Sequence, residues 1–135
     1  MNAVQKVKHM VLIRGAAIYN IDLPEIDSSN IDEVYDKFCI EEEDAIQDGK
    51  QEVRECVYET DITPKIYARN YEVYIGAAEY IDGTFVAWPV LHGGGKHSEP
   101  GYAYDWMSAA FDVDVATRTI VQKYFTEKEN VPQEN

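Results

Sequence analysis

Two apolar runs that flank Asp82-Gly83 constrain the fold of this 135-residue chain more than any other feature. The runs, YEVYIGAAEYI and TFVAWPVL, are rich in the β-branched and aromatic residues that fit a pleated sheet. Asp-Gly is favoured in the type I′ turn of a two-residue hairpin loop. The sequence therefore predicts a central β-hairpin over about residues 71–91.

A two-residue loop also fixes the register of this hairpin. The expected cross-strand pairs are Tyr80 with Phe85, Ala78 with Ala87, Ala77 with Trp88 and Ile75 with Val90. Pro89 has no backbone N–H, so it places the second strand at an edge of the sheet or at a bulge.

The first part of the chain predicts one strand followed by one helix. Residues 4–21 contain β-branched and aromatic residues and no acid, which favours a long strand. Residues 28–30 (SSN) can cap a helix, and an apolar stripe at helical spacing follows from Ile31 to Phe38. This helix ends either near Ile40 or near Gln47, and Asp48-Gly49 is a turn or C-cap signal.

The remaining segments add strands and one short helix. Alternation over residues 50–59 favours a strand, and residues 66–68 favour a second, short one. Residues 102–111 (YAYDWMSAAF) favour a helix, and residues 117–125 (TRTIVQKYF) have strong β character. The whole pattern predicts an α+β fold, a mostly antiparallel sheet with a central β-hairpin and one or two helices packed on one face.

Length and composition favour a single folded unit. A chain of this length with 45% apolar residues lies near the commonest domain size. We expect one globular domain over residues 1–128 and a frayed tail over residues 129–135. Cys39 and Cys56 have no C-x-x-C spacing, and no signal peptide or membrane-spanning run is evident, which predicts a soluble cytoplasmic protein with reduced thiols.

The charge of the chain is concentrated in residues 22–61. This segment has fifteen acids against three bases, a net charge of −12, while the whole chain has −13. Such a field repels nucleic acid and anionic membranes and attracts basic surfaces. Two interpretations follow: a solvated face that keeps the protein soluble, or a contact surface for a basic partner.

The contact-surface interpretation predicts which carboxylates bind. Acids along a helix and its neighbouring strand can imitate the spacing of phosphates, and would occupy the groove of a nucleic-acid-binding protein. The expected partner-binding residues are Asp32, Glu33, Asp36, Glu41, Glu42, Glu43, Asp44, Asp48, Glu52 and Glu55, with residues 41–44 foremost. A calcium loop is a third interpretation, but residues 41–50 lack the EF-hand spacing.

A glycine-rich loop offers an alternative function. Residues 92–97 (HGGGKH) place a lysine among three glycines, and the exposed N–H groups of such a loop can hold an anion. The residues of this alternative site for a nucleotide or phosphorylated metabolite are His92, Gly93, Gly94, Gly95, Lys96, His97, Tyr102 and Tyr104. The spacing fits neither a Walker A loop nor the dinucleotide fingerprint, and a flexible connection is the structural alternative.

The sequence contains no recognisable catalytic or metal-binding motif. His92, His97 and Glu99 could supply three ligands, but they lack zinc spacing. Ser98 adjoins His97, and neighbours in sequence seldom form a nucleophile and its base. We therefore expect no metal, no cofactor and no enzymatic activity.

These expectations combine into one functional hypothesis, a non-enzymatic acidic protein that occludes or inhibits a basic, nucleic-acid-binding partner. Small size, acidity and the lack of a catalytic motif are shared by many inhibitors of host proteins that viruses and plasmids encode. The protein itself would contact neither nucleic acid nor membrane. An open edge after Pro89 and the strand over residues 4–21 would support a homodimer through sheet pairing.

Overall fold

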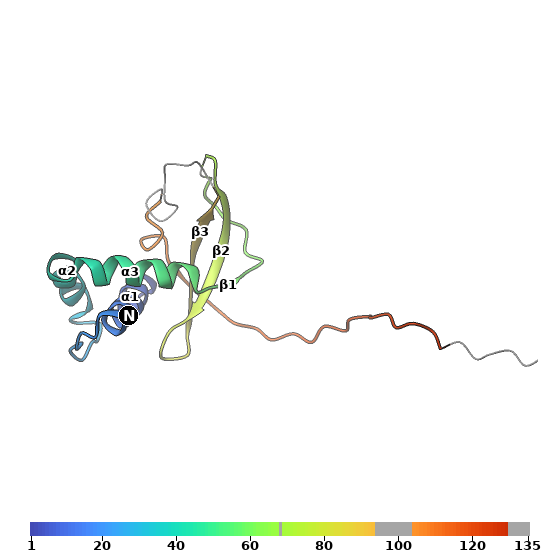
Figure 1. Cartoon of the computed structure of the whole chain (residues 1–135), viewed down its shortest axis with the longest axis horizontal. Coiled ribbons are helices and arrows are strands. Elements are labelled where there is room, and N and C mark those ends of the chain that lie inside the picture. Colours follow the sequence, from blue (N-terminus) through green and yellow to red (C-terminus); the bar gives the residue numbers. More distant parts are fainter. Residues whose placement is uncertain (68, 94–103, 130–135) are drawn as a thin grey trace, which may run out of the picture.

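The computed structural model describes residues 1–67, 69–93 and 104–129 (Figure 1). Three helices come first, α1 (Ala3–Tyr19), α2 (Ile31–Glu41) and α3 (Glu43–Glu55). Four strands follow, β1 (Tyr58–Glu59), β2 (Glu72–Glu79), β3 (Phe85–His92) and β4 (Phe111–Val113). The strands form one antiparallel sheet in the order β1-β2-β3-β4.

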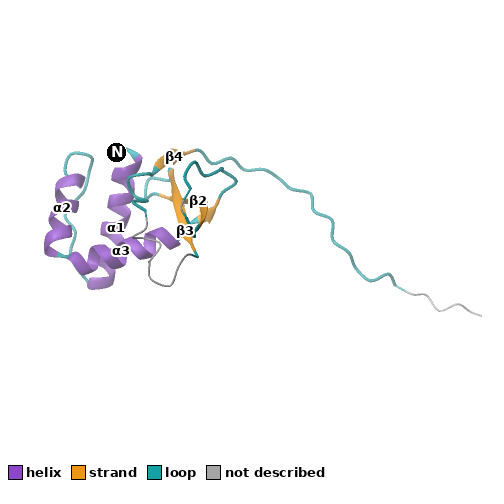
Figure 2. Cartoon of the chain, turned by 90° about the horizontal axis from the view of Figure 1, so that it is seen from above, coloured by secondary structure: helices purple, strands orange, loops and turns teal. Residues whose placement is uncertain are grey.

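The helices form a layer on one side of the sheet, as the two views in Figures 1 and 2 show. Helix α1 is central, because it contacts α2, α3 and the strands β3 and β4. Its residues Val7 and Val11 and the sheet residues Val86 and Trp88 are completely buried in one core. The predicted α+β class with an antiparallel sheet is confirmed, with three helices in place of one or two.

Helix α1 occupies the segment where a strand was expected, so the strand prediction for residues 4–21 is wrong. The side chain of Asn2 accepts a hydrogen bond from the Gln5 backbone at 2.8 Å, and the Gln5 side chain accepts one from the Asn2 backbone at 3.0 Å. This capping box fixes the start of the helix. Burial of Val7 and Val11, one turn apart, outweighs the small helix-propensity loss of β-branched residues.

The helix predicted from Ile31 is confirmed as α2, which ends at Glu41. Helix α3 then begins at Glu43 and continues to Glu55, so the strand predicted over residues 50–59 is wrong except at β1. Asp48-Gly49 lies inside α3 and is neither a turn nor a C-cap. The helical period continues through it, since the buried residues of the apolar side are Ala45, Ile46, Gly49 and Val53.

The central hairpin is confirmed as β2 and β3, but its register differs by one residue from the prediction. Ala77 pairs with Ala87 and Gly76 with Trp88. The loop holds residues 81–83, because the Tyr80 N–H donates to the Thr84 carbonyl at 2.8 Å. The Gly83 N–H donates to the Tyr80 carbonyl at 2.9 Å, and Gly83 has a φ of +88°. A type I turn followed by a left-handed glycine is the usual three-residue hairpin loop.

Pro89 lies where β3 has a strand on one side only. It pairs with Ile75 of β2, while the ladder between β3 and β4 ends at Ala87 and Phe111. Among the described residues, no strand therefore faces the missing N–H of Pro89. Strand β3 as a whole lies between β2 and β4, so the predicted edge position holds only for the part of β3 beyond Ala87.

The C-terminal part of the chain corrects three further predictions. Residues 104–110 form turns and no helix, although Trp106 and Met107 are buried in the core. Residues 66–67 and 117–125 are in no strand, and residues 68 and 102–103 lie outside the described residues. The short β4 was not expected. From residue 114 the chain runs away from the body, and the domain boundaries at 128 and 129 stay a prediction (Figures 1 and 2).

Candidate acidic binding face

The outward side of α3 carries four carboxylates in one row. They are separated by four, four and three residues, which places them on one side of an α-helix. The residues of the row are Asp44, Asp48, Glu52 and Glu55. The apolar side of α3 packs into the body, so the row points to solvent. We call these four residues the acidic helix face.

A shallow depression of about 310 Å³ lies between the acidic helix face and the end of α1. It is lined by Ile18, Asp48, Gln51, Glu52 and Glu55. Ile18 is 43% exposed and contributes an apolar wall to a rim of carboxylates. A lysine or arginine side chain has the matching chemistry, an apolar stem and a cationic head.

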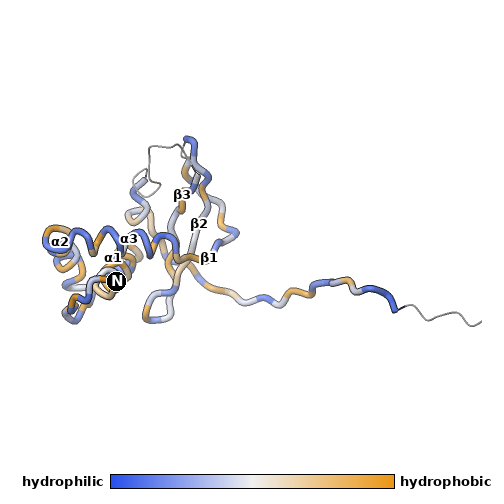
Figure 3. The backbone as a smooth tube through the Cα atoms, in the orientation of Figure 1, coloured by the Kyte–Doolittle hydropathy of each residue, from blue (hydrophilic) through white to orange (hydrophobic). Residues whose placement is uncertain are grey.

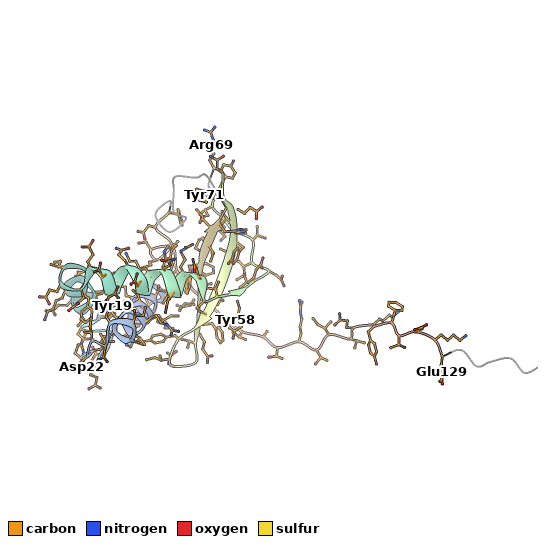
Figure 4. The ribbon with its side chains drawn as sticks, in the orientation of Figure 1. Tyr19, Asp22, Tyr58, Arg69, Tyr71 and Glu129 are labelled. Atoms are coloured by element: carbon orange, nitrogen blue, oxygen red, sulfur yellow. The ribbon has the colours of Figure 1, made fainter. Side chains whose placement is uncertain are left out.

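Tyr19, labelled in Figure 4, lies at the end of α1 and binds one carboxylate of the face. Its hydroxyl donates to Asp48 Oδ2 at 2.5 Å. This hydrogen bond, with some burial and the charges of Asp48 and Asp44, raises the pKa of Tyr19. The hydroxyl therefore keeps its proton and remains a donor to Asp48.

Two arginines form ion pairs with carboxylates of the acidic helix face, and these carboxylates nevertheless stay exposed to solvent. Arg14 Nε lies 3.4 Å from Glu52 Oε2, and Arg54 Nη2 lies 3.1 Å from Glu55 Oε1. The Glu52 and Glu55 side chains are still 48% and 58% exposed. The Arg14–Glu52 pair is exposed on both sides, and such a pair contributes about 0–1 kcal/mol, so a competing cation can replace it at low cost. The Arg54 side chain is buried, so Glu55 serves as the partner of a buried cation as well as a carboxylate of the face.

The residues of α1 at this site were not predicted. Arg14 and Ile18 are one helical turn apart and therefore lie on the same side of α1. In a strand over residues 4–21 the two side chains would not be neighbours. The asparagine-to-glutamine capping box at the chain start was the signal that could have identified the helix.

Two further predicted binding residues, Asp32 and Glu41, also have partners within the chain. Asp32 accepts hydrogen bonds from Lys8 Nζ at 2.9 Å and from Gln5 Nε2 at 3.1 Å, which ties α2 to α1. These hydrogen bonds lower the pKa of Asp32. Glu41 Oε2 lies 4.0 Å from Lys37 Nζ one turn earlier in α2. Both carboxylates remain exposed, so they add to the field of the acidic helix face without being its centre.

The acidic block at residues 41–44 forms the corner between α2 and α3. Glu42 is the C-cap residue of α2 and the N-cap residue of α3, where its side chain forms no capping hydrogen bond, and Glu43 and Asp44 lie in the first turn of α3. Carboxylates there stabilise a helix by about 0.3–1 kcal/mol each through its dipole. Glu33 and Asp36 are exposed on α2 and form no ion pair within the described residues. The predicted residues are therefore spread over α2, the corner and α3.

The alternative ligand loop is only partly within the described residues, which exclude Gly94, Gly95, Lys96, His97 and Tyr102. His92 Nε2 lies 3.1 Å from Glu72 Oε2, and Gly93 has a φ of +79°. Tyr104 is half-buried and packs against the core. In the described part of the chain, no three His, Cys, Asp or Glu side chains come close enough to hold a metal ion.

Comparisons with known proteins add no assignment to this geometry. Neither a family model, nor a curated protein, nor a solved structure matches the chain. In the described ranges, no helix combines the length and apolar character needed to cross a membrane.

The pair of His9 and Tyr80 lies inside the body, away from the acidic helix face. The His9 side chain is buried, with Nδ1 at 2.5 Å from the Tyr80 hydroxyl. Burial lowers the pKa of His9 from its ordinary value of 6.5 and raises that of Tyr80. The imidazole is therefore neutral in the folded protein at neutral pH, and the tyrosine hydroxyl is protonated.

This pair predicts a pH dependence of stability. Unfolded His9 binds a proton near pH 6.5 and folded His9 only at lower pH, so the stabilisation is complete above about pH 6.5 and is lost as the pH falls through the lowered value. We expect a lower melting temperature at about pH 5.5 than at about pH 7.5, and a smaller difference in His9→Gln. Asp27, Asp32 and Asp82, whose pKa values are lowered from 3.8, titrate below this window. Equal differences in both proteins would contradict the assignment.

Proposed function

We propose that this protein is a non-enzymatic acidic binding protein that occludes a basic, nucleic-acid-binding protein. The observation that carries the proposal is the acidic helix face beside the apolar wall of Ile18. An arginine or lysine of the partner would lay its stem on Ile18 and its cation among Asp48, Glu52 and Glu55. The α2–α3 corner would supply additional contacts and long-range attraction.

The charge spacing supports competition with nucleic acid. Carboxylates four residues apart on a helix are about 6 Å apart along its axis, against one phosphate per about 3.4 Å on each strand of B-DNA. One row therefore presents roughly half the linear charge of a DNA strand. The exposed carboxylates of α2 and the corner raise that density, and the net charge of −13 adds long-range steering.

Occlusion would inhibit the partner, and it would take place in a reducing compartment. A protein bound in the groove that normally holds phosphates excludes the nucleic acid, which is inhibition of the kind used against host systems. The two free thiols, Cys39 half-buried and Cys56 exposed, fit a reducing compartment such as the cytoplasm. The small-ligand alternative remains a prediction, because no described contact favours it.

Removing charge from the acidic helix face should slow binding of basic partners. We expect the triple variant Asp44→Asn, Glu52→Gln, Glu55→Gln to lower the association rate constant roughly tenfold at low salt, because steering depends on these charges. Surface plasmon resonance with a panel of DNA- and RNA-binding domains, at low and high salt, measures the effect. The same domains should lose a labelled DNA duplex when the unaltered protein is added.

The matched control removes the same number of charges elsewhere. Glu25→Gln, Glu59→Gln and Glu79→Gln change three exposed carboxylates outside α2 and α3. We expect this control to bind almost as fast as the unaltered protein. Equal slowing by both triple variants would show that only net charge matters, and no binding to any basic domain would refute the proposed function.

A further inference from the structure

We propose that the C-terminal segment 117–125 adds as a β-strand to the open edge of β4 in a second copy of this chain. Reciprocal exchange of the two segments would give a two-fold homodimer with a sheet that continues between subunits. The proposal rests on the exposed apolar character of the segment, on the free sheet edge and on charge, and it is independent of the acidic helix face.

The segment exposes more apolar surface than a tail needs. Its large apolar side chains are 70–93% exposed, and they are Ile120, Val121, Tyr124 and Phe125. Figure 3 shows hydrophobic residues recurring along the tail, and Figure 4 places Glu129 far from the body. Contiguous exposed apolar residues in a water-soluble chain mark interaction sites. Threonines, aromatic residues and β-branched residues dominate TRTIVQKYF, which favours an extended strand.

The structure offers an acceptor for this strand next to the point where the tail leaves the body. Strand β4 is the last in the sheet and pairs only with β3 among the described residues. Phe111 of β4 lies opposite Ala87 and is 36% exposed. Val113 packs with the apolar residues Ile75, Ala77 and Ala87. An added strand would pair with the free N–H and C=O groups of β4 and cover Phe111.

The partner of the tail is more readily a second copy than the chain's own sheet. Residues 114–116 (DVA) contain one residue that favours turns, Asp114, but no glycine for a position with positive φ, and they form no turn in the structure. In the structure the segment runs away from its own body (Figures 1 and 2). Its one ion pair among the described residues joins Arg118 to Asp61 at 3.7 Å, and both side chains are exposed.

Charge is compatible with docking of the segment on a second copy. Residues 115–126 carry two bases, Arg118 and Lys123, and no acid. The bases and acids after residue 114 cancel, so the entire net charge of −13 lies in residues 1–114. A basic, apolar strand is therefore complementary to an acidic body of this kind, and a second copy presents that charge just as the chain's own body does. Because each chain offers both a strand and an edge, two exchanges close one symmetric dimer.

The test measures mass and amide exchange in the full chain. Sedimentation equilibrium should give twice the chain mass of 15.4 kDa. Hydrogen exchange at the amides of residues 118–125 should be slower than in an unstructured peptide by a factor of roughly ten or more. Val121→Pro and Gln122→Pro each remove one backbone N–H group. The N–H groups of successive residues point to opposite edges of a strand, so one of the two variants removes a hydrogen bond to β4. At least one of the two should be a monomer, while Glu129→Pro, outside the segment, should remain a dimer.

Three results would overturn the proposal. The first is a monomeric full chain, with the tail amides unprotected. The second is a monomer with protected tail amides, because the segment would then pair within its own chain. The third is a dimer that both Val121→Pro and Gln122→Pro leave intact. All the changes lie outside the packed body, so each variant should keep the far-UV circular dichroism of the unaltered protein. A variant that becomes a monomer should melt at a temperature that no longer depends on protein concentration.

Discussion

Replacing Trp88 with alanine is expected to lower the free energy of unfolding by about 3–5 kcal/mol, the range for loss of a large buried aromatic side chain. Trp88 is completely buried on β3, and its ring lies 5.2 Å from that of Trp106, centroid to centroid. It belongs to the core cluster that also contains Val7 and Val11 of α1. The cavity would therefore open where the helical layer meets the sheet, and urea denaturation measures the loss.

Trp88→Phe is the matched control for this prediction. Phenylalanine keeps a ring in the core and lacks the indole N–H, which finds no hydrogen-bond partner among the described residues. An unpaired buried donor is unfavourable by about 1–3 kcal/mol, so its removal offsets part of the lost packing. We expect Trp88→Phe to lose less than half as much stability as Trp88→Ala. A loss below about 1 kcal/mol for Trp88→Ala would contradict the central position of this residue in the core.

The hairpin shows what turn chemistry can and cannot predict. Asp82-Gly83 and the flanking apolar runs located β2 and β3 correctly, because glycine is favoured wherever φ is positive. The same dipeptide fits a two-residue and a three-residue loop. Asp82 accepts hydrogen bonds from the backbone and hydroxyl of Thr84, which favours the longer loop. The register therefore depended on whether Ile81 belongs to the strand or to the loop.

In α1 and α3, residue composition favoured strands, whereas the spacing of the apolar residues favoured the helices that the structure contains. The β-branched residues of α1 favoured a strand, while Val7 and Val11 already had helical spacing. In α3, the count of acids was visible in the sequence, but their common side was not, because residues 50–59 were assigned to a strand. Glu52 and Glu55 join Asp48 around one depression only when α3 continues to Glu55 and packs against α1. The candidate site thus required tertiary structure.

Gly49 lies inside α3, where the Asp48-Gly49 dipeptide predicts a turn, and its role there is to allow close packing against α1. A Cβ atom at Gly49 would lie 2.5 Å from the Val11 carbonyl oxygen, and one at Gly15 would lie 2.2 Å from the Ala45 carbonyl oxygen. The two glycines face each other, since the Gly49 Cβ position is also 3.0 Å from the Gly15 nitrogen. They let the backbones of α1 and α3 come closer than any side chain would allow.

Gly49→Val is therefore expected to lower the free energy of unfolding by about 2–3 kcal/mol, in the upper part of the range for overpacked cores. The obstacle is backbone of α1, so the helices must separate to accommodate the side chain. Gln51→Val places the same residue at an exposed position of α3 and should lower stability by only a few tenths of a kcal/mol, from helix propensity. Thermal and urea denaturation of both variants measure the contrast.

A double variant tests the shared crossing directly. Gly15→Val should also destabilise, but separation of the helices by one substitution makes room for the other. The loss in the Gly15→Val, Gly49→Val protein should therefore be smaller than the sum of the two single losses, by about 0.5–3 kcal/mol. Additive losses would mean that the glycines act at independent places. Equal stability of Gly49→Val and Gln51→Val would mean that α1 and α3 do not make this close approach, and the depression that depends on their packing would lose its support.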